Sequence, residues 1–117
     1  ELVVPKALAI GPKIQATFKK AYKAGVKIAF GSDAGVYPHG INGKEFGYMN
    51  EVGMPAMECI QSATITNALI LSMENDLGKI KEGFIADIVA TEDNPIDNIS
   101  TMENVVFVMK EGVVYKN

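Results

Sequence analysis

The sequence of 117 residues has no arginine and no tryptophan, and it has one cysteine and one histidine. Lysines supply all 11 basic residues against 14 acidic ones, for a net charge of −3. Arginine is the usual side chain for bidentate phosphate and guanine contacts, so its absence, with the acidic balance, argues against a nucleic-acid-binding protein. No apolar run approaches the roughly 20 residues of a membrane span, so we expect no membrane partner. The single Cys59 excludes an internal disulfide and fits a cytoplasmic location.

The composition is that of ordinary globular protein, with 48% hydrophobic and 21% charged residues. The length suits one small domain and is under half of the ~250 residues of a complete (β/α)₈ barrel. The first residue is Glu1 and not methionine, so we expect the chain to be part of something longer.

The first part of the chain has an α/β pattern. Residues 1–10 are apolar with a proline inside, and we interpret them as an incoming loop or the tail of an upstream element. Apolar residues at helical spacing predict a helix over 12–24. Residues 26–31 follow almost without a linker and are rich in β-forming residues, which predicts a strand of a parallel sheet.

A polar, glycine-rich loop follows this predicted strand. Asn42 and Glu45 have the spacing of a capping box, which predicts the start of the next helix. Gly53 is expected to end that helix, Pro55 to start another, and Thr66 to restart a short helical turn.

The pattern changes to all-β near residue 77. Short strands are predicted at 78–80 and 86–90, and a hairpin is predicted where 105–109 and 113–115 flank Lys110-Glu111-Gly112. Gly78 and Gly83 are expected to be turn residues.

The segment with the most chemical information is residues 25–40, GVKIAFGSDAGVYPHG. Asp33 lies just past the carboxyl end of the predicted strand, and in barrel enzymes the loops that carry active-site residues converge at that edge. Position alone leaves open that Asp33 is only a loop residue or a helix cap.

Several motifs here resemble those of the amidohydrolase superfamily. Gly31-Ser32-Asp33-Ala34-Gly35 resembles its eighth barrel strand, and Pro38-His39-Gly40 continues as in the imidazolonepropionase-like subgroup, which includes Xaa-Pro dipeptidase-like enzymes. Residues 45–54 are similar to its E-x-x-x-M-x-E-x-G-M pattern. Residues 77–89, LGKIKEGFIADIV, resemble the signature of its small β domain.

This resemblance implies a fold class and a domain division. We expect an α/β fold, namely the C-terminal portion of a TIM-type (β/α)₈ barrel followed by short strands of a small β-sandwich domain. Residues 1–73 would be the last barrel portion, and residues 74–117 would be part of the composite β-sandwich.

The resemblance also implies a chemistry. These enzymes use one or two divalent metals, commonly zinc, to activate a water that attacks an amide-like carbon–nitrogen bond. Asp33 matches the aspartate that binds metal and carries the proton. The family's other ligands, an H-x-H pair, a central Lys or Glu and two later histidines, have no match here, so we expect the fragment alone to be inactive. A divalent metal, zinc as the first choice, is expected in the parent enzyme, and the fragment by itself need not bind one.

Two further residues are candidates for the site, each with a plainer alternative. His39 either contacts the substrate's carboxylate or carbonyl or makes a local hydrogen bond within its loop. Ser32 either orients Asp33 or satisfies the backbone at the end of the strand. The other singled-out residues are read as structural, through packing or turn hydrogen bonds: Met49, Met54, Met57, Cys59 and Asp87.

The expected partners are a small amide or dipeptide substrate and further copies of the chain, in a homo-oligomer that pairs the exposed strand edges and apolar faces. A non-enzymatic α/β interaction or oligomerisation module is the alternative, and another metal hydrolase such as a deaminase also stays open. An upstream H-x-H pair would favour the hydrolase over the module.

Overall fold

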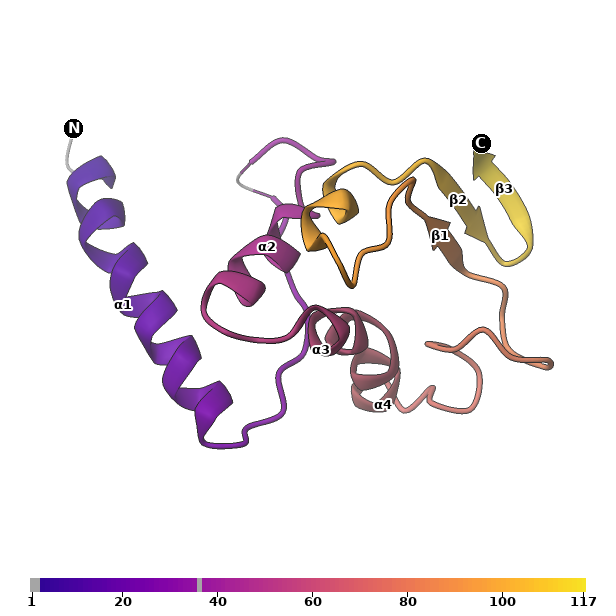
Figure 1. The fold of residues 1–117 in the computed structure, drawn as a ribbon, viewed down its shortest axis with the longest axis horizontal. Helices are drawn as coiled ribbons and strands as arrows, with labels where there is room; N and C mark the ends of the chain where they lie inside the picture. Colours follow the sequence, from indigo (N-terminus) through magenta and orange to yellow (C-terminus); the bar gives the residue numbers. More distant parts are fainter. Residues whose placement is uncertain (1–2, 36) are drawn as a thin grey trace.

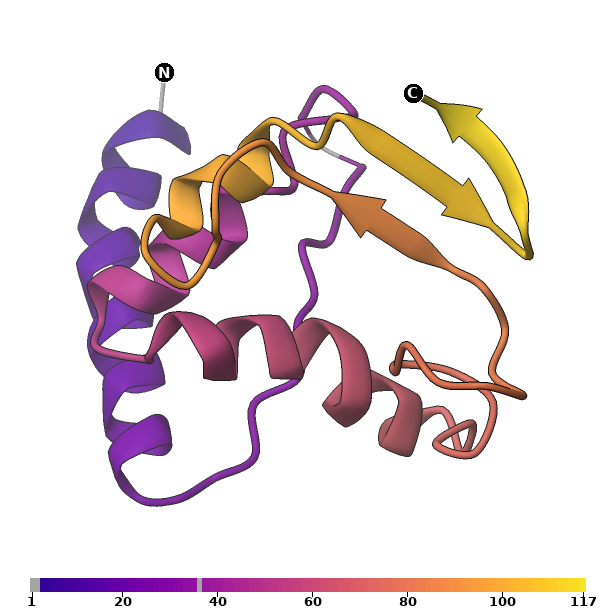
Figure 2. The ribbon, with the colours of Figure 1, turned by 45° about the vertical axis from the view of Figure 1, so that its right-hand side comes forward.

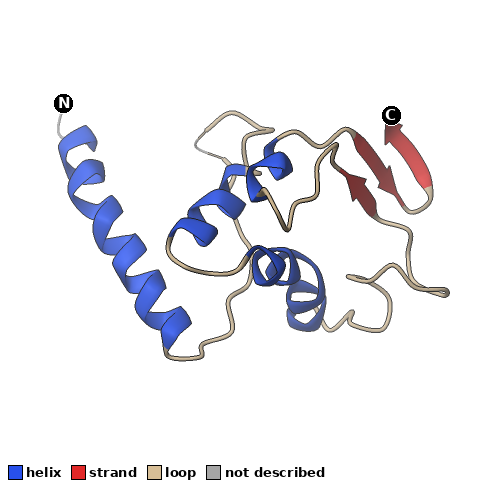
Figure 3. Ribbon diagram, in the orientation of Figure 1, coloured by secondary structure: helices blue, strands red, loops and turns tan. Residues whose placement is uncertain are grey.

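The computed structural model describes residues 3–35 and 37–117, with the helices first in the chain and a small sheet last (Figures 1 and 3). The elements are α1 (Val3–Lys23), α2 (Lys44–Glu51), α3 (Ala56–Gln61), a π-helical segment (Ser62–Thr66), α4 (Asn67–Ile70), β1 (Ile88–Ala90), a 3₁₀ helix (Ile99–Glu103), β2 (Phe107–Lys110) and β3 (Val113–Lys116).

Helix α1 begins earlier than the sequence pattern predicts. It runs unbroken from Val3 through Pro12, so the predicted loop is wrong over residues 3–10. Pro5 falls in the first turn, where backbone N–H groups have no partner within the helix, and so it does not interrupt the start. The alanine- and leucine-rich stretch that follows favours helix strongly enough to extend it through Pro12.

Residues 26–31 are extended but do not form the predicted parallel strand. A strand needs neighbours for its backbone, and within the described residues this segment lies beside a helical run. The backbone N–H of Phe30 donates to the carbonyl of Ser62 at 3.3 Å, and Asn67 Nδ2 donates to the carbonyl of Phe30 at 3.0 Å. The helical run thus holds Phe30 by both of its backbone groups.

Helix α2 does not begin with the predicted capping box. Its N-cap is Gly43, and Asn42 contributes its main-chain carbonyl, which accepts from the N–H of Glu45 at 3.2 Å. Gly43 packs so closely on the 3₁₀ helix that a Cβ there would lie 2.5 Å from the carbonyl oxygen of Met102. This close packing places the glycine at the cap.

The two helices predicted after Pro55 are one continuous helical run, residues 56–70, with the π-helical segment in its middle. The Ser62 hydroxyl donates to the carbonyl of Cys59 at 2.6 Å, and the Thr64 hydroxyl donates to that of Ile60 at 2.8 Å. Such side chains compete for the carbonyls of the preceding turn, which accounts for the local widening of the helix.

The sheet is antiparallel in the order β1-β2-β3, and the predicted hairpin is confirmed. Glu111 and Gly112 form its two-residue turn with φ of 51° and 80°, as a primed turn requires. Asp87 accepts hydrogen bonds from the Glu111 N–H at 2.7 Å and Lys110 Nζ at 2.9 Å, which lower its pKa and confirm its structural role. The strand predicted at 78–80 is wrong, because these residues turn.

The core lies between the helices. Phe46, Met49, Met54 and Cys59 are buried, and the rings of Phe30 and Phe46 stack with centroids 4.4 Å apart. Burial raises the pKa of the Cys59 thiol to about 11, so its structural role is confirmed. The prediction that Met57 packs inside is wrong, because it is 49% exposed.

The chain exposes far more surface than a self-contained protein of its mass. Its accessible area is 8464 Å², roughly a third above the ~6,200 Å² typical of 12.6 kDa. Its radius of gyration is 15.7 Å, against about 13 Å for a compact chain of this length. Figure 2 shows α1 and the sheet at opposite ends of the molecule. Among the described residues, no helix has both the length and the apolarity needed to cross a membrane.

Replacing Gly78 with alanine is expected to destabilise the fold by about 2–4 kcal/mol, combining backbone strain with overpacking. Gly78 has φ +84°, and a Cβ there would lie 2.8 Å from the carbonyl oxygen of Thr64. Gly83 is the matched control, since its φ is +88° with no atom within 4 Å of the added Cβ. Its alanine variant should lose only about 1–2 kcal/mol from strain. Urea denaturation followed by circular dichroism measures both, and equal losses would contradict the clash at Gly78.

Candidate functional site

The predicted site residues lie in the loop that leads from the extended segment to α2 (Figure 1). Asp33 and His39 are exposed, and Ser32 is half-buried. Asp33 has φ +46°, in the left-handed region that few residues besides glycine, asparagine and aspartate adopt. The structure therefore places all three on one loop, with Asp33 at a sharp turn of the backbone.

The backbone just before Asp33 is fixed from two directions. Phe30 is held by Ser62 and Asn67 of the helical run, as described above. The Tyr37 hydroxyl donates to the carbonyl oxygen of Ser32 at 2.5 Å, which closes the loop around Asp33. The contact of Ser32 with Tyr37 is thus made by its main-chain carbonyl and not by its side chain.

A cavity of about 270 Å³ lies on the flank of this loop, between the loop and α2. Ser32 and Tyr37 line it from the loop, and Glu45 and Tyr48 line it from the helix. Burial raises the pKa of the Glu45 carboxyl. The sequence pattern did not single out Tyr37 as a site residue, and its place inside the GVYPHG stretch was the one available signal.

The donor set bears on whether a metal fits. Over residues 3–35 and 37–117, no three His, Cys, Asp or Glu side chains come together in a way that could hold a metal ion. A catalytic zinc usually takes three protein ligands and keeps one position open. The exposed Asp33 carboxylate suits one oxygen ligand of such a site. Within the described residues, Asp33 therefore fits as one ligand of a metal site.

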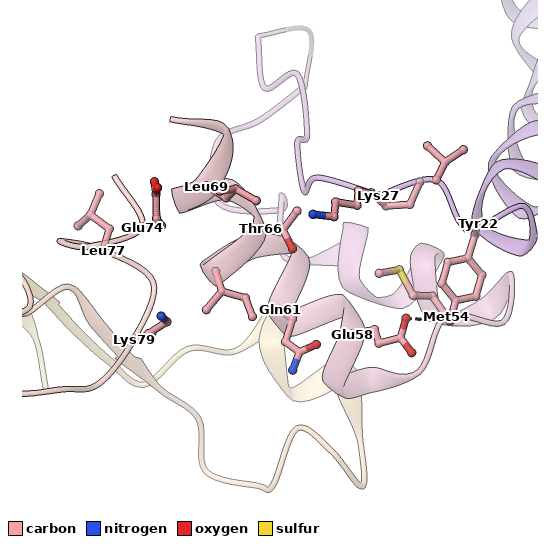
Figure 4. A pocket seen from close by; sticks show the side chains of 14 residues that line it. Tyr22, Lys27, Met54, Glu58, Gln61, Thr66, Leu69, Glu74, Leu77 and Lys79 are labelled. Atoms are coloured by element: carbon pink, nitrogen blue, oxygen red, sulfur yellow. Dashed lines mark hydrogen bonds between the residues drawn. The ribbon is translucent and has the colours of Figure 1, made fainter. Parts of the chain in front are cut away.

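A second cavity, of about 500 Å³, lies elsewhere and contains none of the three predicted residues (Figure 4). Tyr22 and Glu58 lie at one end of it, and the Tyr22 hydroxyl donates to Glu58 Oε2 at 2.9 Å, which raises the pKa of Tyr22. Glu74 lies toward the other end. Its Oε2 is buried and has no hydrogen-bond partner among the described residues. This cavity is therefore separate from the candidate site.

Comparison with known proteins gives the class and the family of the fold. This α/β arrangement with its small antiparallel sheet is similar to solved structures that include an amidohydrolase, a Xaa-Pro dipeptidase and a prolidase. The model of the amidohydrolase family matches residues 3–115. The chain belongs to the amidohydrolase family, which confirms the resemblance found in its motifs.

Three relatives show how much of a family member is present. The ochratoxinase of Aspergillus niger is 35% identical over 104 residues, which cover 85% of this chain and 21% of that protein. A crystal structure of a Xaa-Pro dipeptidase with bound methionine has a TM-score of 0.91 and 56% identity, covering 97% of this chain and 28% of that one. A prolidase complexed with N-methylphosphonate-L-proline has a TM-score of 0.85 and 32% identity, covering 97% and 29%. The chain therefore spans less than a third of the length of these relatives.

Proposed function

We propose that this chain is the C-terminal part of a metal-dependent hydrolase that cleaves carbon–nitrogen bonds in small amide or dipeptide substrates. The observation that carries the proposal is the position of Asp33, in a G-S-D-A-G motif at the end of a segment held by the helical run, within a chain that matches the family over residues 3–115. Residues 1–73 would complete the barrel, and residues 74–117 would belong to a β-sandwich built with strands from elsewhere in the protein.

Asp33 is the residue proposed to touch the reacting atoms. One of its carboxylate oxygens would hold a divalent metal, zinc as the first choice, together with ligands from the rest of the protein. Such a metal lowers the pKa of water to about 7 and so supplies the nucleophile. The other oxygen can accept a proton from the attacking water and later deliver it to the leaving nitrogen. Because one carboxylate does both, no second acid–base residue is required from this chain.

His39 and Ser32 are proposed in supporting roles. His39 lies exposed six positions after Asp33, on the same loop, where its ring N–H can donate to a carboxylate or carbonyl of the substrate. Ser32 precedes Asp33 directly and would help to orient it.

Metal removal tests the proposal. The full-length protein, assayed with a panel that includes Xaa-Pro dipeptides, should lose turnover when a chelator removes its metal and regain it when zinc is added back. The isolated 117-residue chain should show no turnover with or without zinc, since it supplies one ligand. Turnover that survives chelation, or turnover by the isolated chain, would contradict the proposal.

The alternative, a non-enzymatic module that binds a partner or oligomerises, is favoured by one observation, the excess of accessible surface. A full-length protein without hydrolase activity towards the whole panel, in a folded and metal-loaded form, would favour that alternative.

A further inference from the structure

We propose that Tyr37 is a positioning residue that sets the direction of the Asp33 carboxylate through its hydrogen bond to the carbonyl of Ser32. The inference rests on the proposed function, because it assumes that Asp33 takes part in the reaction. It assigns a role to a side chain that the predicted site did not include.

The hydrogen bond acts on the peptide group that leads into Asp33. The Tyr37 hydroxyl lies 2.5 Å from the carbonyl oxygen of Ser32, and both residues are half-buried. That carbonyl belongs to the planar peptide unit between Ser32 and Asp33, so holding the oxygen fixes the plane. The torsion φ of Asp33 is the rotation about its N–Cα bond, and this peptide plane is one of the two planes that define it. The tyrosine therefore restrains one side of that torsion.

The restrained value is one that L-residues adopt uncommonly. Asp33 has φ +46°, and an L-residue prefers negative φ. Without the hydrogen bond, the peptide plane can rotate and let φ relax. Because the Cα–Cβ bond follows the backbone, such a rotation turns the carboxylate away from its present direction.

The contacts on either side explain why the hydrogen bond from Tyr37 to the Ser32 carbonyl is expected to matter for Asp33. Upstream, Asn67 and Ser62 fix Phe30, which leaves the short link through Gly31 and Ser32 free to turn. Downstream, Tyr37 is half-buried and lines the cavity between the loop and α2, opposite Glu45 and Tyr48. The Tyr37 hydroxyl thus ties the backbone at Ser32 to a half-buried side chain. A displacement of about 1 Å in a reacting group can cost on the order of a hundredfold in rate.

Kinetics of the full-length enzyme test the inference with a phenylalanine substitution. Tyr37→Phe keeps the ring and removes the donor, and we expect kcat to fall by about tenfold or more while KM stays within about threefold. Tyr22→Phe is the matched control, because it also removes a hydroxyl that makes one hydrogen bond, to Glu58, in the other cavity. It should keep wild-type kcat. Incorporation of 4-aminophenylalanine at position 37, which restores an N–H donor, should recover most of the activity.

A second measurement does not depend on turnover. In the metal-free full-length protein, backbone amides of residues 32–40 should exchange with deuterium severalfold faster in Tyr37→Phe than in the wild type or in Tyr22→Phe. Unchanged exchange in this loop, or kcat within about twofold of wild type, would overturn the inference. If the wild-type protein shows no turnover but the loop exchanges faster in Tyr37→Phe, the proposed function fails and the restraint on Asp33 stands. If Tyr37→Phe is misfolded, two other variants at position 37 replace it, one with 4-aminophenylalanine and one with a fluorinated tyrosine. Deuterium exchange of the loop and kcat are then compared between these variants and the wild type. If neither quantity changes in the fluorinated variant, the inference is overturned.

Discussion

Asp33→Asn in the full-length protein is expected to lower kcat by about 10²–10⁴-fold, the usual contribution of a positioned acid–base group. The amide has the shape of the carboxylate but lacks its charge and cannot carry the proton. The fold should tolerate it well, because asparagine is one of the few residues that adopt a φ such as the +46° seen here. Steady-state kinetics and the thermal unfolding midpoint, measured on the same preparation, separate the two effects.

The control for this substitution is Asp93→Asn, an exposed aspartate in the loop after β1. It loses one negative charge, as the Asp33 variant does, and should leave kcat unchanged. If Asp33→Asn keeps near-normal kcat, or if its loss of activity follows a matching loss of folded protein, the assignment of Asp33 is wrong.

The isolated 117-residue chain is expected to associate instead of remaining a monomer. Its surplus of accessible surface is large, and apolar side chains of the helices contribute to it, among them Ile14 and Ile70, each 63% exposed. Apolar surface on this scale seeks other chains. The strand β3 adds a second route, since all of its residues are exposed and, among the described residues, it pairs only with β2.

Light scattering coupled to size exclusion, at low micromolar concentration, measures the association. We expect species heavier than 12.6 kDa whose proportion increases with concentration. A monodisperse monomer that unfolds cooperatively would contradict the expectation. It would mean that this part of the family fold is stable by itself.

The structural features that the sequence predicted best are those set by residues adjacent in the chain. The hairpin around Glu111 and Gly112 needs two residues that accept positive φ between β-forming runs, and both signals are local. The helix predicted over 12–24 starts too late, because Pro12 lies inside α1 and not in its first turn. The two helices predicted after Pro55 are one, joined by the π-helical segment. The sequence did not predict this segment, because the hydroxyl hydrogen bonds that accompany it leave no mark on the spacing of apolar residues.

What depends on distant neighbours could not be predicted in the same way. Residues 26–31 have the composition of a strand, but a strand is defined by its partners, and the described residues offer a helix there instead. At the site, the motif pointed to Asp33, His39 and Ser32. It did not identify Tyr37 or Asn67 as the residues that hold the loop, because each acts by a hydrogen bond to the main chain of a partner that the motif does not specify.

The chemistry of the single thiol has a practical consequence for spectroscopy. Cys59 is fully buried, and its pKa of about 11 leaves almost no thiolate at neutral pH. Maleimide reagents should therefore not react with Cys59 in the folded protein. A cysteine introduced at the exposed Ala34, directly after Asp33, can then carry a fluorophore or spin label as the only reactive thiol of this chain, without prior removal of the natural one. The movements of the loop can in this way be followed by a probe placed beside the carboxylate.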